Sequence, residues 1–252
     1  MALLSGAMTH APDPPVTAQL LGLESTKTWS LIATLFGDLD GDELSGKAIW
    51  SVLEPLGIKP EAMRVALHRL KKDGWIVSQK AGREVIYRLS DQARAETQAA
   101  RLDVYRPDPK FDAGWRLVML APGSDPINGP HVVLDKALIL VPQQAAVPDA
   151  ALELTMSDPI PVWVEDAMVP RHLRDQAVTL TGLAKAFLAT GPAGDTITAR
   201  LLFLHYWRKM ALRLGTWAHI GIMPDGTMAQ CQRAITDVLR DTDRIRPKHQ
   251  DT

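Results

Sequence analysis

The sequence predicts an α+β protein with a helical first third that ends in a β-hairpin, a small sheet in the middle and a helical last third. Apolar residues recur at helical spacing in three segments before residue 73, and again in three segments after residue 175. Between residues 115 and 164, short apolar runs are separated by Pro, Gly and Asp, which is typical of strands. A chain of 252 residues is long enough for two or three domains with more than one buried core.

Residues 1–23 combine prolines and small residues without hydrophobic periodicity, which predicts a flexible arm. The first helix is predicted over Ser25–Phe36, with Gly37 as its stop. A second helix is expected to begin at Ser45, whose hydroxyl suits an N-cap, and to end at Pro55.

The next segment, Ile58–Trp75, is predicted to be a short helix with one apolar and one basic face. Pro60 suits its first turn and Gly74 its end. The predicted buried stripe consists of Met63, Ala66, Leu67 and Leu70. The opposite side carries Arg64, Val65, His68 and Lys72, flanked by Arg69 and Lys71. An exposed valine among hydrogen-bond donors suits a helix in the major groove of DNA, where donors reach base edges and methyl groups contact thymine.

Two strand-like runs follow, Trp75–Ser78 and Arg83–Leu89, joined by residues 79–82. The side chains expected to alternate inward are Trp75, Val77, Val85, Tyr87 and Leu89. Two helices, a basic third helix and a hairpin with a basic tip occur in the order of a winged helix-turn-helix. A solvated helix face beside an ordinary hairpin is the alternative interpretation.

The charge distribution supports contact with DNA. The whole chain has a net charge of −1, but the segment from Lys59 to Arg88 contains eight basic and three acidic residues, which gives it a local charge of +5. We expect the residues near the start of the basic helix to lie deepest in the groove. The residues predicted to face bases are Arg64, Val65 and His68, and those predicted to contact mainly phosphates are Lys59, Arg69, Lys71, Lys72, Lys80 and Arg83.

The stretch from Leu31 to Ser90, and above all IKPEAMRVALHRLKKDGW with the preceding LFGD, closely resembles the N-terminal domain of the phenylacetic-acid degradation repressor (PaaX) family. The resemblance implies a dimeric winged-helix repressor of an aromatic-acid catabolic operon. It also implies a ferredoxin-like central domain and a helical C-terminal domain. In this chain the brief SDPINGP stands where the family has a helix, so the central module is expected to be shortened. Release from a palindromic operator by an aryl-CoA thioester such as phenylacetyl-CoA is implied as well.

The rest of the chain divides at a connecting helix, Asp91–Tyr105, which the proline-containing segment 106–109 terminates. The candidate strands of the middle domain are 115–121, 132–133, 138–141, 152–156 and 160–164. The last domain is expected to contain the helices 175–190, 195–214 and 227–239. The predicted domains are 24–106, 107–169 and 170–252.

An acyl-CoA needs an apolar pocket and cations about a nucleotide's length away. The candidate effector-binding residues are Arg171, Arg174, Trp207, Arg208, Lys209 and Arg213, with Trp163, Phe187 and Trp217 as further apolar candidates. The stripe of His205, Arg208, Lys209 and Arg213 is predicted to face away from the core of its own helix. A solvated helix face remains the alternative for this stripe.

Neither a cofactor nor a metal is expected, because the histidines lack metal-ligand spacing and Cys231 is a single cysteine. The sequence contains no constellation of catalytic residues. Without a leader or a long apolar segment, a cytoplasmic protein that does not enter the membrane is expected. The second function class that stays open is a metal-dependent nuclease or other enzyme built on the central sheet, with the winged helix as a protein-contact module.

Overall fold

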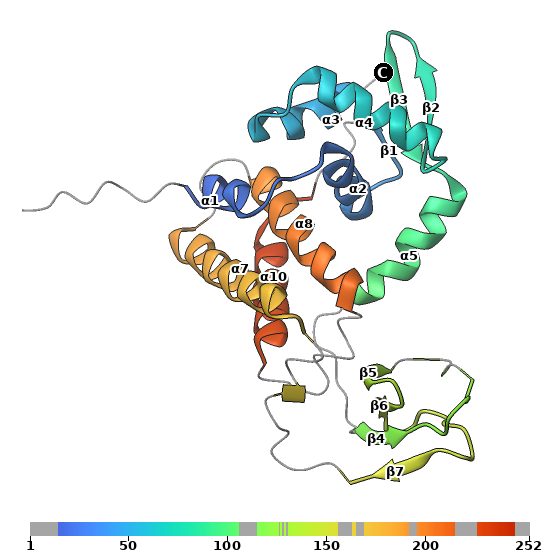
Figure 1. Ribbon diagram of the computed structural model, residues 1–252. Helices are drawn as coiled ribbons and strands as arrows, with labels where there is room; N and C mark the ends of the chain where they lie inside the picture. Colours follow the sequence, from blue (N-terminus) through green and yellow to red (C-terminus); the bar gives the residue numbers. More distant parts are fainter. Residues whose placement is uncertain are drawn as a thin grey trace, which may run out of the picture.

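A computed structural model describes residues 15–105, 115–125, 127, 129, 131–155, 163–164, 169–191, 196–214 and 226–244 (Figure 1). The described residues form an α+β fold with two small antiparallel sheets. One sheet lies at one end of the molecule beside the N-terminal helices, the second lies at the opposite end, and long helices occupy the region between them.

The first helix, α1 (Val16–Leu23), was not expected from the sequence. The prediction of a flexible arm over residues 1–23 is therefore wrong for residues 16–23, whereas residues 1–14 lie outside the described part of the chain. The reason is tertiary packing: Leu20 is fully buried, and its carbonyl accepts a 2.7 Å hydrogen bond from the Tyr206 hydroxyl. A helix of eight residues that is stabilised mainly by packing against a distant helix shows little hydrophobic periodicity in its own sequence.

The helices α2 (Thr28–Asp38), α3 (Gly46–Leu53) and α4 (Pro60–Lys72) confirm the three predicted N-terminal helices. Ser45 caps α3, because its hydroxyl oxygen accepts a 3.1 Å hydrogen bond from the Ala48 amide. A single 3-10 turn, η1 (Glu54–Leu56), then leads to Gly57, whose φ of 72° is in the left-handed region that glycine tolerates. This turn sets the angle between α3 and α4.

The hairpin consists of β2 (Ile76–Ala81) and β3 (Glu84–Leu89), and β1 (Glu43–Ser45) pairs with the other edge of β3. Its two-residue turn begins at Gly82, with a φ of 59°. The predicted inward set is wrong for Val77, because Ile76 pairs with Leu89 and both are buried while Val77 is exposed. Val85, which pairs with Lys80 next to the hairpin turn, is also exposed.

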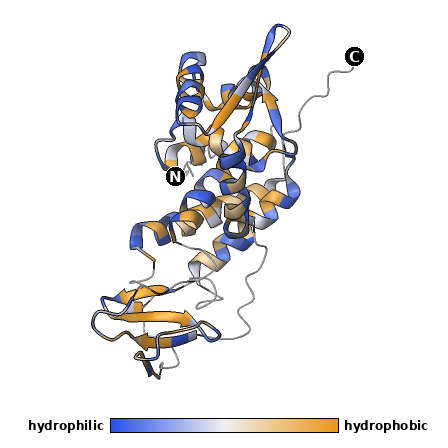
Figure 2. Ribbon diagram, turned by 90° about the vertical axis from the view of Figure 1, so that its right-hand side faces the viewer, coloured by the Kyte–Doolittle hydropathy of each residue, from blue (hydrophilic) through white to orange (hydrophobic). Residues whose placement is uncertain are grey.

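The second sheet has the order β5-β6-β4-β7 and is antiparallel throughout. Its strands are β4 (Trp115–Met119), β5 (Val132–Asp135), β6 (Leu138–Pro142) and β7 (Leu152–Leu154). Apolar residues predominate along them (Figure 2). A ferredoxin-like module has helices between its first two and its last two strands. The described residues of the corresponding connections, β4 to β5 and β6 to β7, form no helix. The expected fifth strand, 160–164, falls mostly outside the described residues, and its last two residues are helical.

The last part of the described chain contains α7 (Arg171–Thr190), α8 (Thr196–Leu214) and α10 (Thr227–Asp241). Every residue of α8 from Thr198 to Trp207 is buried, so this helix is enclosed on all sides. It packs against α7 and α10 as well as against α1, α2 and α5. One continuous hydrophobic core therefore joins the N-terminal and the C-terminal helices.

A buried ion pair reinforces this junction. The Arg200 guanidinium on α8 donates hydrogen bonds to both carboxylate oxygens of Asp38 at the end of α2, and the two side chains are 3% and 8% exposed. Arg200 also donates to the Thr242 carbonyl at 3.0 Å, and Tyr105 at the end of α5 donates to Asp38 at 3.1 Å. Four elements thus meet at one charge-compensated cluster.

Candidate nucleic-acid interface

The helix α4 is anchored from its inner side. Ala66, Leu67 and Leu70 are buried against the core shared with α2, while Pro60 occupies the first turn, where its missing N–H is not needed. Gly74, with a φ of 72°, ends the helix and turns the chain into β2. The inner face predicted from the sequence is confirmed for these three residues, and Met63 is partly buried against the same core.

The outer face of α4 is accessible. Val65 is 69% exposed, more than any other large apolar side chain in the part of the chain that the structure describes. Arg64, His68 and Lys72 lie on the same face of α4, and all three are exposed. A methyl surface flanked by cationic and imidazole donors therefore projects from a rigid helix.

Three of the basic residues make local contacts. Arg64 lies 3.4 Å from Glu61, and because both side chains are 71% exposed this pair contributes little to stability. The Arg69 guanidinium lies 5.1 Å from the centroid of the Trp29 ring on α2, a cation–π distance, and 3.5 Å from Asp73. Lys71 donates a 2.9 Å hydrogen bond to the Ser78 hydroxyl on β2. The Arg69–Trp29 contact connects α4 to α2, and the Lys71–Ser78 hydrogen bond connects α4 to the hairpin.

The hairpin adds further exposed cations beside α4 (Figure 1). Lys80 lies in the last part of β2 and Arg83 in the turn, and both are exposed. Lys59, directly before α4, is exposed as well. All nine side chains predicted to contact DNA are thus accessible and belong to α4, its start and the adjoining hairpin.

This segment is also where the chain is similar to known proteins. Residues 27–93 match the family described as PaaX-like protein. Over 100 residues the chain is 37% identical to the Transcriptional repressor PaaX of Escherichia coli (strain K12), an alignment that covers 38% of this chain. The alignment spans only 31% of the length of that repressor.

Among solved structures, the chain is similar to the uncharacterized protein Rv0674 from Mycobacterium tuberculosis, with 17% sequence identity and a TM-score of 0.42. That alignment covers 83% of this chain and 97% of the other.

Outside the PaaX-like region, the predicted effector residues do not gather on one open surface. Trp207 is fully buried and donates a 2.9 Å hydrogen bond from its indole nitrogen to the Val104 carbonyl. Lys209 forms a 2.7 Å ion pair with Glu24, which lies directly after α1. Arg171 and Arg213 are exposed, and Arg174 is partly buried. Of the further apolar candidates, Trp163 is 55% exposed, Phe187 is buried and Trp217 lies outside the described residues.

The prediction that the α8 stripe faces away from the core is wrong for His205 and Arg208. His205 is 1% exposed and lies 3.2 Å from the Thr34 hydroxyl, and Arg208 donates a 3.1 Å hydrogen bond to the same oxygen. Burial, followed by the nearby charges of Arg208 and Lys209, lowers the pKa of His205 to about 4. The helical spacing is confirmed, but α2 covers His205 and Arg208, whereas Lys209 and Arg213 stay exposed.

Among the described residues, no group of three or more His, Cys, Asp or Glu side chains is arranged to hold a metal ion. Cys231 is buried, and burial raises the pKa of its thiol to about 12. No helix within the described ranges is long and apolar enough to cross a membrane.

Proposed function

We propose that this protein is a transcriptional repressor that binds double-stranded DNA through a winged helix-turn-helix formed by α2, α3, α4 and the β2–β3 hairpin. The observation that carries the proposal is the exposed Val65 between basic donors on the outer face of α4. A valine that is 69% exposed contributes little to hydrophobic packing in the core, but it can contact a thymine methyl group in the major groove. The match of residues 27–93 to the PaaX-like family model and the similarity of 100 residues of the chain to a transcriptional repressor support the same conclusion.

In this proposal α4 enters the major groove and the hairpin lies along the adjacent backbone. Arg64, Val65 and His68 face base edges, since they lie in the first two-thirds of α4. The remaining cations neutralise phosphates: Lys59, Arg69, Lys71, Lys72, Lys80 and Arg83. The contacts of Arg69 with Trp29 and of Lys71 with Ser78 hold two of these cations in place before DNA arrives.

Fluorescence anisotropy with the DNA upstream of the protein's own gene tests this function. Specific binding should exceed binding to a scrambled duplex of the same composition and should weaken with rising salt, because bound cations displace counterions. Arg240→Ala, which removes an exposed cation on the distant helix α10, is a matched control and should not change the affinity. Equal binding to both duplexes at every salt concentration would contradict sequence-specific repression.

We further propose that an acyl-CoA thioester such as phenylacetyl-CoA releases the repressor from a palindromic operator of an aromatic-acid catabolic operon. The resemblance of the N-terminal segment to the PaaX family supports this effector. Trp207 is buried and Lys209 forms an ion pair with Glu24, so the residues proposed to contact the effector are the exposed Arg171, Arg213 and Trp163 and the partly buried Arg174. Arg208 is not part of the proposed effector site, since its guanidinium donates a hydrogen bond to Thr34 on α2.

Calorimetry with phenylacetyl-CoA, free CoA and acetyl-CoA tests the effector, together with operator binding in the presence of each. Phenylacetyl-CoA should bind and weaken operator binding by the ratio of its affinities for the free and the DNA-bound conformation. No heat with any of the three, and unchanged operator binding, would remove the effector while leaving the DNA-binding proposal in place.

A further inference from the structure

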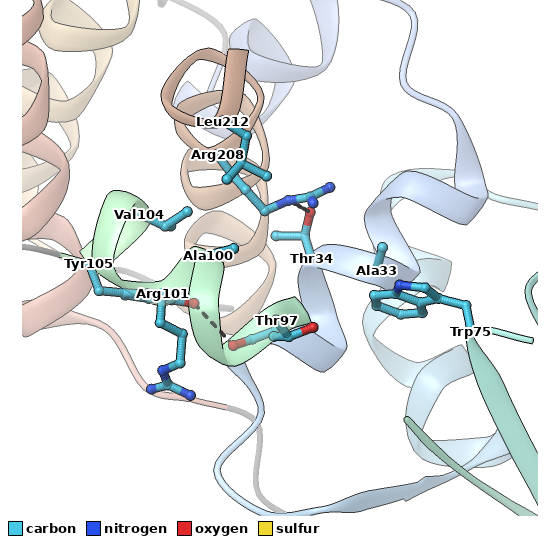
Figure 3. A pocket seen from close by; sticks show the side chains of 11 residues that line it. Ala33, Thr34, Trp75, Thr97, Ala100, Arg101, Val104, Tyr105, Arg208 and Leu212 are labelled. Carbon is cyan, nitrogen blue, oxygen red and sulfur yellow. Dashed lines mark hydrogen bonds between the residues drawn. The ribbon is translucent and has the colours of Figure 1, made fainter. Parts of the chain in front are cut away.

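A small cavity lies between α2, α5 and α8, on the inner side of the DNA-binding elements (Figure 3). Its volume is about 50 Å³, several times the roughly 10–15 Å³ that a single water molecule needs. Ala33, Ala100, Val104 and Leu212 give it apolar walls, and the ring of Trp75 closes one side. A cavity of this size and lining can hold a short aliphatic chain.

The polar group that this cavity presents is the guanidinium of Arg208. Its Nε donates a 3.1 Å hydrogen bond to the Thr34 hydroxyl, and its Nη2 lies 3.4 Å from the Ser30 carbonyl. Among the described residues, Nη1 of Arg208 donates no hydrogen bond, and no carboxylate lies within ion-pair distance of Arg208. Burial lowers the pKa of Arg208 from its ordinary value, yet an arginine stays protonated in proteins. A partly desolvated positive charge thus has neutral partners only.

A second cation stands at the same cavity. Arg101 on α5 contributes to the lining, and its guanidinium lies 5.2 Å from the centroid of the Tyr105 ring. Within the described part of the chain, Arg101 also forms no ion pair with a carboxylate. Asp38 accepts a hydrogen bond from the Tyr105 hydroxyl but is itself paired with Arg200. The cavity therefore carries excess positive charge over apolar walls.

From this combination we propose that the cavity binds a short monocarboxylate, with its carboxylate on Arg208 and its alkyl chain against Ala33, Ala100 and Val104. A buried charge is costly unless it is paired, so an anion that enters gains the interaction that Arg208 lacks. The apolar walls favour a carboxylate with a hydrocarbon tail over inorganic phosphate, which has no apolar part to bury. The site goes beyond the proposed repressor function, because it requires neither DNA nor a nucleotide.

The position of the cavity gives this ligand a structural consequence. Its walls come from α2, from Trp75 between α4 and the hairpin, from α5 and from α8. A bound carboxylate therefore bridges the DNA-binding elements and the enclosed helix α8.

Thermal unfolding and calorimetry of the full chain with butyrate test the proposal. Butyrate should raise the melting temperature with increasing concentration, since a ligand that binds the folded state stabilises it. Butyramide, which has the same shape without the charge, sodium phosphate and sodium chloride at equal ionic strength should each have at least tenfold weaker effects. Equal shifts with butyrate and butyramide would overturn the proposal. Stronger binding of phosphate than of butyrate would overturn it as well, because the ligand would then be an inorganic oxyanion without an alkyl chain.

Two variants locate the site. Arg208→Gln should weaken butyrate binding at least tenfold, and Ala100→Leu should abolish it by filling the cavity while both arginines remain. Ala100→Leu keeps a good helix former in α5, so it decides the question if Arg208→Gln does not fold. Arg94→Gln removes an exposed cation from the same helix and should leave binding unchanged. Unaltered butyrate affinity in Ala100→Leu would place the binding elsewhere and refute the site. Because no DNA is present, this outcome is independent of operator binding.

Discussion

Arg64 and Lys72 lie on the same exposed face of α4 but at different distances from its start, and this difference predicts different roles. Arg64→Ala should cost about 1–3 kcal/mol of operator binding and relax the sequence preference, because a base contact is lost. Lys72→Ala should weaken operator and random duplex alike and reduce the salt slope by about one. Anisotropy titrations at several salt concentrations measure both quantities. Identical losses on operator and random duplex for Arg64→Ala would show that Arg64 contacts only the backbone.

His205 predicts a loss of stability at acidic pH. Its pKa is about 4 in the folded protein, chiefly through burial, and returns to about 6.5 on unfolding. Between these values the unfolded chain binds more protons, so the free energy of unfolding falls as the pH is lowered from about 6.5 to 4, by at most about 3 kcal/mol. Above pH 6.5 the residue contributes no pH dependence. Urea unfolding across this range measures the effect.

The variant His205→Asn serves as the comparison, because an amide keeps a polar group near Thr34 but does not titrate. Its stability should change less steeply between pH 6.5 and pH 4 than that of the wild-type chain. His68→Asn, at an exposed position on α4, is the matched control and should follow the wild-type profile. Parallel curves for all three proteins would show that His205 is protonated in the folded state.

At the scale of elements, the Asp38–Arg200 pair connects α2 to α8 and should dominate their docking. Asp38→Asn preserves size but leaves the Arg200 guanidinium buried without its counter-charge, so a loss of about 3–5 kcal/mol is expected. Asp42→Asn breaks an exposed pair with Arg94, in which the two side chains are 43% and 76% exposed, and should cost less than about 1 kcal/mol. Denaturant unfolding compares the two variants. Similar small losses would mean that the buried pair adds nothing beyond an exposed one.

The elements that local chemistry defines were predictable from the sequence, and those that depend on distant partners were not. The N-cap at Ser45, the proline start and glycine end of α4 and the connecting helix Asp91–Tyr105 all follow from nearby residues. The outer face of α4 was predictable because an apolar stripe on one side leaves its opposite side exposed. The inward face of β2 was not, since Trp75 and Ile76 are both apolar and only the pairing with β3 decides which one points inward.

The same limit affects the second half of the chain. The helix α8 has apolar and cationic residues on different sides, which alone predicts one buried and one solvated face. Arg208 on its cationic side is instead partly buried, because Thr34 and Ser30 on α2 offer oxygen acceptors to its guanidinium, whereas Arg213 stays exposed. This match between polar groups depends on how α2 and α8 are placed relative to each other, so the spacing of residues within α8 does not reveal it. The short helix α1 escaped prediction for the same reason.

At the scale of the whole molecule, we predict a symmetric homodimer on DNA. One winged helix reads few base pairs, and a second copy on the other half of a palindrome supplies the missing specificity. Multi-angle light scattering at micromolar concentration should give twice the mass of the 27.7 kDa chain. The stoichiometry on an operator duplex should be two chains to one duplex. A monomer with one-to-one stoichiometry would contradict this arrangement.

The core that joins α8 to the N-terminal helices limits how the chain can be recombined. An excised fragment that ends at Tyr105 would expose the faces of α2 and α5 that pack on α8, and Asp38 would lose its guanidinium partner. A chimera that exchanges residues 27–93 with a relative brings a foreign α2 against the native Arg200 and Arg208. If α4 reads DNA as proposed, exchanging its specificity therefore requires that the residues of α8 that face α2 be transplanted together with the N-terminal segment, even though more than a hundred positions separate α4 and α8 along the chain.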